Sequence, residues 1–268
     1  MSLTGKTKAG SYKDLLQMNN SNNGVNTSAN RVVDGEGTES AIYLSDDSLT
    51  VRPVNDDTST ALFVRSQGGT PLLAVDTANS VVRAGLNQDT VNTQYAHFGI
   101  LSANLGGSAF ADDTHHPLVF NGGVHSDSSN PPAFGTGTDP ATTFTTAEAN
   151  ATRASDLVPM MWRVPDDITI DEIKHFEGAD TATGDMATRM HLMYYNFSSG
   201  NTNCLTAGAV AANTSADNSN AGSEQPYLKD WTIGTADIDA GKVLLCMFRS
   251  DSINSDYSIS VTIKYHLR

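Results

Sequence analysis

The densest group of potential metal ligands lies in the stretch ADDTHHP, which places Asp112, Asp113, His115 and His116 within five residues. Carboxylate and imidazole groups together can bind a transition metal. A metal site needs three or four converging ligands, however, and neighbouring residues of an extended chain point in different directions. We therefore expect a solvated loop without a metal. One alternative stays open, in which one histidine from each of three chains meets on a threefold axis.

Acidic residues form several other short clusters. Residues 237–241, DIDAG, begin like a calcium-binding loop, but Phe248 stands where an EF-hand loop requires a glutamate. We expect a turn there, and also at the aspartate pairs 46–47, 56–57 and 166–167, because aspartate side chains bond to the local backbone in turns. Two carboxylates held about 5–10 Å apart could cleave a glycoside. Neighbours in sequence rarely have that geometry.

No catalytic motif is present. The chain lacks G-x-S-x-G, a Walker loop, H-E-x-x-H and C-x-x-C, and its Gly-rich stretches LGGSAF and GTGTD have no strand–helix context. Several aromatic residues near the C-terminus could stack on a carbohydrate, but such residues more often lie in a core or a subunit interface. These are Trp162, Trp231, Tyr194, Tyr195, Tyr227 and Tyr257. We therefore expect no catalytic residues and no cofactor.

Composition limits the classes of partner. The 268 residues carry a formal net charge of −14, so nucleic acid and anionic membranes would repel the chain overall. No run approaches the roughly 20 apolar residues of a membrane-spanning helix, and the first residues, MSLTGKTKAG, show no secretory signal. We expect neither nucleic-acid binding nor membrane insertion. Cys204 and Cys246 are expected as two buried, reduced thiols, with a single disulfide as the less favoured alternative.

The elements that must position these residues are strands, because Gly, Ser, Thr, Asn and Asp are abundant and favour turns. Residues 1–38 begin with one expected short helix, SYKDLLQM at 11–18, followed by an Asn-rich tract that can bury little apolar surface. We interpret 1–38 as a docking arm laid onto a neighbouring chain or a larger assembly. The alternative is an arm folded back on its own domain. The apolar residues expected to dock are Tyr12, Leu15, Leu16 and Met18.

Residues 39–85 predict an array of five- or six-residue strands separated by turn signals. Its stretch TALFVRSQGGTPLLAVDTANSVVRAG, residues 60–85, carries apolar residues on both strand faces. So short an array cannot bury a core alone. Three copies around a threefold axis would form a thin β-prism, or shaft. The expected interface residues are Leu62, Phe63, Val64, Leu72, Leu73, Val75, Val81 and Val82.

Residues 86–155 are rich in loop-forming residues and almost without periodicity, so we expect an extended connector that runs along a fibre or wraps a neighbour. Residues 156–268 predict a β-sandwich of about six to eight strands, jelly-roll-like. The last segment alternates most clearly, with the apolar side of Tyr257, Ile259, Val261, Ile263, Tyr265 and Leu267 on one face. The predicted fold class is all-β throughout.

Long stretches of the chain resemble a known class of protein. GKTKAGSYKDLLQMNNSNNGV, DGEGTESAIYLSDDSLTVRPVND and LLAVDTANSVV resemble the start of fibre-like structural proteins of marine tailed bacteriophages. VPDDITIDEIKHFEGADTATGD and KVLLCMFRSDSINSDYSISVTIKYHLR are similar to their terminal domain. The resemblance covers residues 86–155 least and includes no catalytic motif.

The resemblance implies a virion protein, assembled in the host cytoplasm and exposed on the particle surface. It implies a homotrimer whose N-terminus binds other virion proteins of the tail or capsid and whose C-terminal domain faces a host-surface glycan or protein. The main alternative is a capsid cement or decoration protein that stabilises the head. A tail-associated glycan hydrolase is a remote alternative. The sequence indicates no particular receptor-binding residue.

Overall fold

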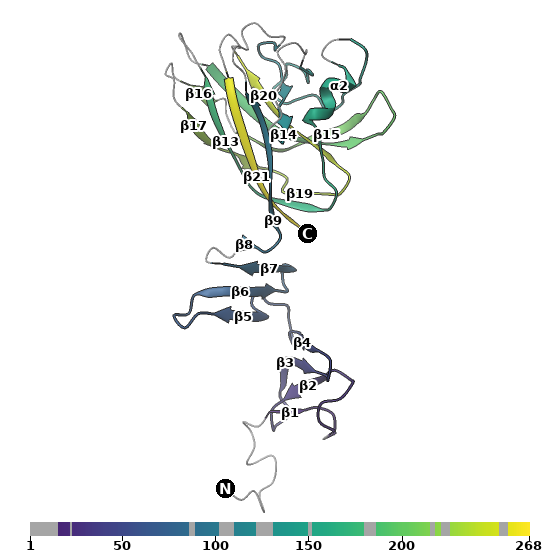
Figure 1. The fold of residues 1–268 in the computed structure, drawn as a ribbon, viewed down its shortest axis with the longest axis vertical. Helices are drawn as coiled ribbons and strands as arrows, with labels where there is room; N and C mark the ends of the chain where they lie inside the picture. Colours follow the sequence, from purple (N-terminus) through teal and green to yellow (C-terminus); the bar gives the residue numbers. More distant parts are fainter. Residues whose placement is uncertain are drawn as a thin grey trace, which may run out of the picture. The chain divides into compact units, whose positions relative to one another are not determined.

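The computed structural model of the chain describes residues 16–21, 23–85, 89–101, 110–121, 131–149, 152–179, 186–214, 218–220, 226–251 and 257–268. The chain divides into two compact units, residues 1–91 and residues 92–268 (Figure 1). The fold is all-β, as predicted. In the described ranges the strands form antiparallel sheets, accompanied by the short helix α2 (Ala154–Leu157) and the 3-10 turn η2 (Val158–Met160).

The first sheet of the first unit contains, in order, β1 (Gln17–Met18), β2 (Asn30–Val33), β3 (Glu39–Leu44) and β4 (Leu49–Val51). The helix predicted over residues 11–18 is wrong at its end, because Gln17–Met18 pair with β2; residues 11–15 lie outside the described part.

The Asn-rich tract forms the turn between β1 and β2, and its side chains bond to the nearby backbone. The Asn23 amide donates to Asn20 Oδ1 at 3.3 Å, and the Asn23 side chain donates to the Asn20 carbonyl at 2.8 Å. Asparagine favours turns for this reason. Over residues 17–33 the arm therefore folds back on its own sheet, which was the alternative to docking.

The second sheet of the first unit contains β5 (Leu62–Arg65), β6 (Pro71–Asp76), β7 (Val81–Ala84) and β8 (Asp89–Thr90), in that order. The predicted strands of residues 60–85 lie where the sequence places them. The turn between β5 and β6 closes through a hydrogen bond from the Gly69 amide to the Ser66 carbonyl, with Gly69 at φ +84°. Glycine adopts that conformation without steric cost.

The second unit contains a seven-stranded and a six-stranded sheet. The larger follows the order β10 (His116–Pro117), β20 (Val243–Ser250), β14 (Met186–Phe197), β15 (Leu205–Asn213) and β18 (Thr232–Ile233), with β12 (Trp162–Arg163) and β16 (Asn218–Asn220) paired to β20 and β14. The smaller follows the order β11 (Val119–Phe120), β9 (Thr93–Leu101), β21 (Tyr257–Leu267), β13 (Ile168–Ala179) and β17 (Tyr227–Asp230), with β19 (Asp237–Ile238) paired to β13. Before β12, residues 158–160 form η2 and not a strand, because Pro159 has no amide to donate to a ladder.

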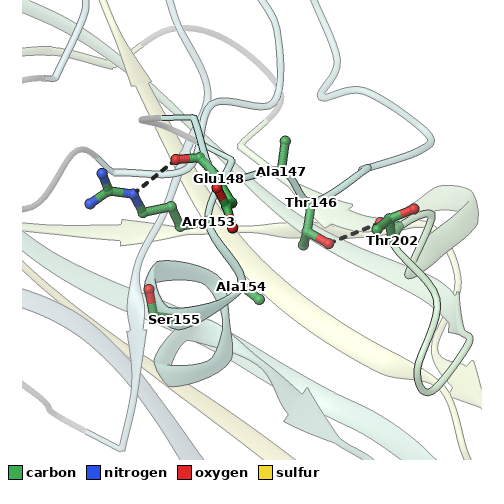
Figure 2. A pocket seen from close by; sticks show the side chains of 7 residues that line it. All are labelled: Thr146, Ala147, Glu148, Arg153, Ala154, Ser155 and Thr202. Carbon is green, nitrogen blue, oxygen red and sulfur yellow. Dashed lines mark hydrogen bonds between the residues drawn. The ribbon is translucent and has the colours of Figure 1, made fainter.

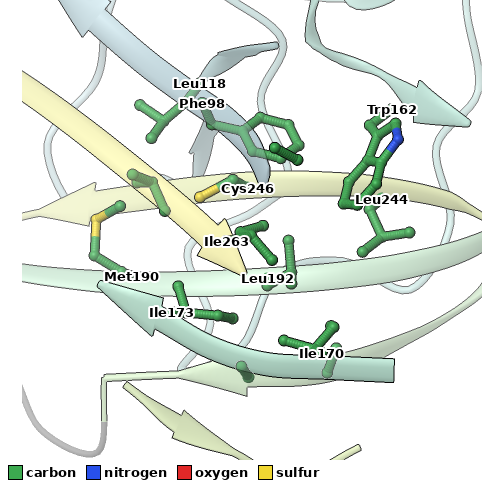
Figure 3. Packing of buried hydrophobic residues seen from close by; sticks show 14 of the residues in the cluster. Phe98, Leu118, Trp162, Ile170, Ile173, Met190, Leu192, Leu244, Cys246 and Ile263 are labelled. Atoms are coloured by element: carbon green, nitrogen blue, oxygen red, sulfur yellow. The ribbon is translucent and has the colours of Figure 1, made fainter. Parts of the chain in front are cut away.

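The two sheets pack face to face around one apolar core (Figure 3). The alternation predicted in the last strand is confirmed at its centre, where Ile259, Val261 and Ile263 are buried. From the opposite sheet, Leu192 and Cys246 pack into the same core. Both cysteines are free and buried, as predicted, and burial raises the pKa of the Cys246 thiol, which keeps it protonated.

Residues 93–101 are a central strand and not a connector. β9 pairs with β21 along its whole length, from Thr93 opposite His266 to Leu101 opposite Ser258. The stretch QYAHFGI does alternate, with Ala96, Phe98 and Ile100 buried. This strand was not predicted, because His97 and Gly99 separate its three buried apolar residues and weaken the alternating pattern.

Residues 131–149 also belong to the second unit and cover the outer face of the larger sheet. Phe134 and Phe144 stack with ring centroids 4.6 Å apart, and both belong to a second apolar cluster with Tyr195 of β14. The Tyr195 ring fits only because residue 208 is glycine: a Cβ there would lie 2.3 Å from the ring. The expected extended connector is therefore wrong for this segment, which forms a third layer.

Replacing Phe98 by Ala is expected to lower the unfolding free energy of the second unit by about 3–5 kcal/mol, because a buried ring would leave a cavity between the sheets. Urea denaturation followed by tryptophan fluorescence measures the change. Phe197→Ala is the matched control, since Phe197 is exposed, and surface changes usually cost within about 0.5 kcal/mol. Equal losses in the two variants would contradict this account of the core.

Candidate functional site

The surface of the second unit carries a groove made of two adjoining hollows, of about 640 and 350 Å³. Both volumes lie within the range of small-molecule sites. The two hollows share Thr146, Ala154 and Thr202 (Figure 2). The remaining residues of the larger hollow are Ala147, Glu148, Arg153 and Ser155, and those of the smaller are Leu157, Val158, Met161, Phe197, Ser198, Gly200, Asn201 and Cys204.

The groove is positioned by backbone pairing together with α2 and η2, which supply Ala154, Ser155, Leu157 and Val158 to its lining. The turn between β14 and β15 forms one wall and is closed by the Ser198 amide, which donates to the Cys204 carbonyl at 2.9 Å. The segment after Phe144 runs beside this turn. Its Thr146 donates to the Thr202 carbonyl twice, from the amide at 2.7 Å and from Oγ1 at 3.2 Å. These bonds fix the distance between the two walls.

The two ends of the groove differ in chemistry. The smaller hollow has an apolar lining, with Phe197 and Val158 exposed at its rim. The larger carries Glu148 and Arg153, whose Nε donates to the Glu148 carbonyl at 3.4 Å, so both ionic groups still face outward (Figure 2). An apolar patch beside convergent polar groups fits a ligand with one apolar face and several hydroxyls. Among the described lining residues Glu148 is the one carboxylate, whereas glycoside cleavage uses two.

The histidines of ADDTHHP do not lie in a solvated loop, which corrects that expectation: both are fully buried. His116 Nδ1 bonds the Pro132 carbonyl and His115 Nδ1 bonds the Gly135 carbonyl, each at 3.1 Å. The two histidines are adjacent in the sequence, and both bond to the covering segment, residues 131–149, and hold it against the larger sheet. Among the described residues, no group of three His, Cys, Asp or Glu side chains could hold a metal ion.

His191 of β14 completes this cluster. Its ring lies edge-on to that of His115, with centroids 5.0 Å apart, and its Nε2 lies 3.3 Å from Asp139 Oδ1 of the covering segment. Neither His191 ring nitrogen has a well-formed hydrogen bond. Burial lowers the pKa of His191 to about 4, and repulsion from His115 and Arg189 acts in the same direction. Burial likewise lowers the pKa of His115.

The other charges near the pair are Arg249 and its partner Asp113. Arg249 faces Arg189 across β20 and β14, and its guanidinium bonds Asp113 Oδ1 at 2.7 Å. The positive charge of Arg249 also disfavours protonation of His115 and so lowers its pKa. The pair is therefore a neutral element of packing at pH 7, and protonating it would place a cation beside arginines.

A second buried network joins the two sheets. Trp231 Nε1 donates to His175 Nδ1 at 2.8 Å, so the His175 proton lies on Nε2, which is 3.3 Å from Glu177 Oε2. Thr188 donates to the same carboxylate oxygen at 2.7 Å. Buried polar groups bonded to one another specify how two layers fit. Since His175 and Glu177 are buried, the network holds β13 against β14 and does not face a substrate.

The aromatic residues that could have stacked on a carbohydrate are mostly core residues. Trp162 and Tyr195 are buried, and Tyr194 and Trp231 pack against the core. Residues 240–241 form the expected turn before β20, whereas Asp237–Ile238 form β19. The three aspartate pairs lie outside strands, in bends and loops between them. The groove itself was not found from sequence, because its two walls lie far apart in the chain and are joined by long-range pairing, of Phe144 with Leu205 and of Thr146 with Thr202.

The expected shaft residues divide between two faces of the β5–β8 sheet. Leu62 lies opposite Val75, Val64 opposite Leu73, and Val75 opposite Val82, so these five share one face. Phe63, opposite Ala74, and Val81, opposite Asp76, share the other. Leu72 is exposed beside the register shift between β5 and β6.

The first of these faces is apolar across β5, β6 and β7, where Ala84 completes it. Leu62 and Val64 remain 41% and 42% exposed on it. The opposite face is shielded by its own charges, since the Arg65 guanidinium lies 4.2 Å from the Phe63 ring and Arg83 lies 3.9 Å from Asp76.

The expected docking residues are only partly described. Leu16 is exposed and Met18 is half-buried in β1, while Tyr12 and Leu15 lie outside the described residues. In the described part of the chain, no helix is long and apolar enough to cross a membrane. No protein-family model matches the chain, and no curated protein matches it.

The unfolding free energy of the second unit is expected to fall as the pH decreases from about 6.5 to about 4. In this range the unfolded chain, whose histidine pKa is near 6.5, protonates His191 while the folded unit does not. One such proton gives a slope of about 1.4 kcal/mol per pH unit. Urea denaturation followed by tryptophan fluorescence reports on this unit, since Trp162 and Trp231 both lie in it.

His191→Phe is expected to flatten that slope, because phenylalanine occupies a similar volume and does not titrate. His97→Phe is the control, since His97 is exposed on β9. If His191→Phe and the parent protein show the same slope, the buried pair is not the source of the pH dependence.

Proposed function

We propose that this protein is a trimeric virion fibre that attaches to the particle through its N-terminus and presents its second unit to the host surface. The observation that carries the proposal is the uncovered apolar face of β5–β7. This face is formed by Leu62, Val64, Leu73, Val75, Val82 and Ala84. Covering it with other copies would stabilise the assembly by roughly 25 cal/mol per Å² of apolar surface buried. Three copies around an axis would form the β-prism.

The β1–β4 sheet supports the same arrangement. Ile42 lies opposite Val51 and Leu44 opposite Leu49, so this sheet also has an apolar face, and Ile42 and Leu49 are exposed on it. The other face carries Tyr43, covered by two arginine side chains. Both sheets of the first unit therefore shield one face themselves and leave the apolar one for a partner. Two copies would cover such faces as well as three; the number three comes from the resemblance to phage fibres.

The second unit supports a recognition role through its groove. The groove lies on loops and a turn that a rigid two-sheet scaffold holds in place, which is the usual position of binding residues. Its apolar rim and its ionic end suit a saccharide, so a host-surface glycan is the receptor class we favour. The jelly-roll connection between strands is part of this proposal.

A capsid cement protein is the alternative, because uncovered sheet faces could equally bind neighbouring capsid subunits. The two functions differ in copy number, since a tail fibre is present in few copies on a particle and a cement protein in many. The glycan hydrolase is less favoured, because the groove offers one carboxylate among its described residues.

Val64→Asp is expected to dissociate the assembly into folded monomers, with association weakened at least tenfold. The new carboxylate would be buried without a partner in the assembly, but stays solvated in the monomer, where this position is exposed. Arg65→Asp is the matched control: it adds an aspartate one residue later on the same strand, on the opposite face, and is expected to leave the mass unchanged. Light scattering gives the mass. An assembled Val64→Asp protein would contradict the proposed shaft.

Arg153→Ala is expected to weaken binding of the fluorescently labelled protein to host cells at least tenfold, because it removes the groove's guanidinium. Arg163→Ala is the control, since Arg163 is also exposed, on β12 of the same unit and outside the groove. Equal binding by both variants would show that the groove does not bind the receptor. It would not contradict the proposed assembly of the first unit.

A further inference from the structure

The outer face of the six-stranded sheet carries an apolar pair that no described part of the chain covers. Phe176 of β13 lies directly opposite Leu228 of β17, and the two side chains are 58% and 54% exposed. On its other side Phe176 lies opposite Ser260, and Ser260 lies opposite Gly99 of β9. One row across four strands thus has two large apolar side chains at one end and two small residues at the other.

The next rows of this face are charged but balanced. Lys174 lies between Asp230 and Thr262, and it forms ion pairs with Asp230 at 3.8 Å and with Glu172 at 2.9 Å. In the following row Glu172 lies opposite Lys264.

The exposed ring of Tyr95 lies opposite Lys264 and ends that row. Within these rows two lysines and two acidic residues cancel, beside three exposed large side chains, Tyr95, Phe176 and Leu228. In the row beyond Lys264, Asp171 pairs with His266 at 2.9 Å.

We propose that this face binds further copies of the same chain, so that contact between copies extends from the first unit to the second. The inference rests on the proposed fibre, since the first unit brings the copies together. Within one chain, association through one unit raises the effective concentration of the other. A weak second surface then contributes to a contact that it could not make alone.

Charge and shape both favour a second copy as the occupant. A chain of net charge −14 repels its own copies over most of its surface, and contact is least opposed where the local charge is zero. In a threefold ring each contact is heterologous, so one part of the surface meets a different part of the next copy. This face offers two different parts, because Phe176 and Leu228 are large and exposed, whereas Gly99 and Ser260 in the same row are small.

Hydroxyl-radical footprinting of the full chain tests the proposal, because exposed aromatic rings are oxidised and covered ones are protected. Phe176 and Tyr95 are expected to react at least fivefold more slowly in the assembled protein than in protein diluted until it dissociates. Phe197 is the internal control, since it is exposed and lies outside this face. Its rate is expected to stay the same.

The outcomes separate this inference from the fibre itself. Assembled protein in which Phe176 reacts as fast as in the monomer overturns the inference and leaves the shaft intact. Protection of Phe176 in a Val64→Asp protein that still associates would support this face and overturn the shaft. A parent chain that stays monomeric at every concentration overturns both.

A double variant, Phe176→Ser with Leu228→Ser, gives a second measurement. It is expected to weaken association at least tenfold, because the apolar pair is lost while both positions tolerate polar side chains in the monomer. Phe197→Ser is the matched control and is expected to associate like the parent chain. Equal association of the double variant and the control would contradict the proposal even if Phe176 were protected.

Discussion

A sheet of a few short strands has two faces, and its own side chains can shield only one of them from water. This constraint governs the first unit. In the β5–β8 sheet the shielded face uses charge and an aromatic ring, with Arg65 over Phe63 and Arg83 beside Asp76. The other face has only apolar side chains across three strands, and the described chain supplies no second layer for it. In the proposed assembly other copies supply that layer, and the driving force is the same hydrophobic effect that closes a core within one chain.

The second unit solves the same problem within one chain. The six-stranded sheet covers one face of the larger sheet, and residues 131–149 cover the other. That covering segment is irregular, so its backbone groups need partners. His115 supplies them with its amide, carbonyl and ring, which bond Gly135 and Phe134. On the outer face of the smaller sheet, no described residue provides such a layer over Phe176 and Leu228. The two units thus differ in how many layers they complete, and both leave one sheet face open.

Local pattern predicted much of this fold. β6, Pro71–Asp76, lies within the predicted strand array, because the turn signals QGGT and TANS bound the apolar run PLLAV. β15 was missed, since its residues 205–213 are mostly Ala, Gly and Thr, which carry little strand signal, yet Ala211 and Ala212 are buried in the core. What alternation alone could not give is which face of β5–β7 is charged, because register decides that. Arg83 lies opposite Ala74 only once the strands are paired.

The candidate site was less predictable for the same reason. The groove depends on two long-range pairs, Phe144 with Leu205 and Thr146 with Thr202, and none of these residues has a chemical signature. His115 and His116 did have one, but their role depends on burial, which turns adjacent imidazoles into anchors for a covering segment. Sequence spacing indicates which residues could act together only when a single strand or turn holds them. Here the groove depends on packing between segments that lie far apart in the chain. The same kind of packing buries His115 and His116 and turns them away from a metal-binding role.

The distribution of charge affects both units. Most acidic residues that the structure describes lie between strands, where aspartate bonds the local backbone. The face of β5–β7 formed by Leu62, Val64 and Val75 is apolar, and the charges beside Phe176 are paired, so repulsion between two acidic copies would be weakest at these two faces. In the proposed assembly, the charge distribution that opposes other contacts would favour these. A mutation that shifts charge onto either face should therefore weaken the proposed association.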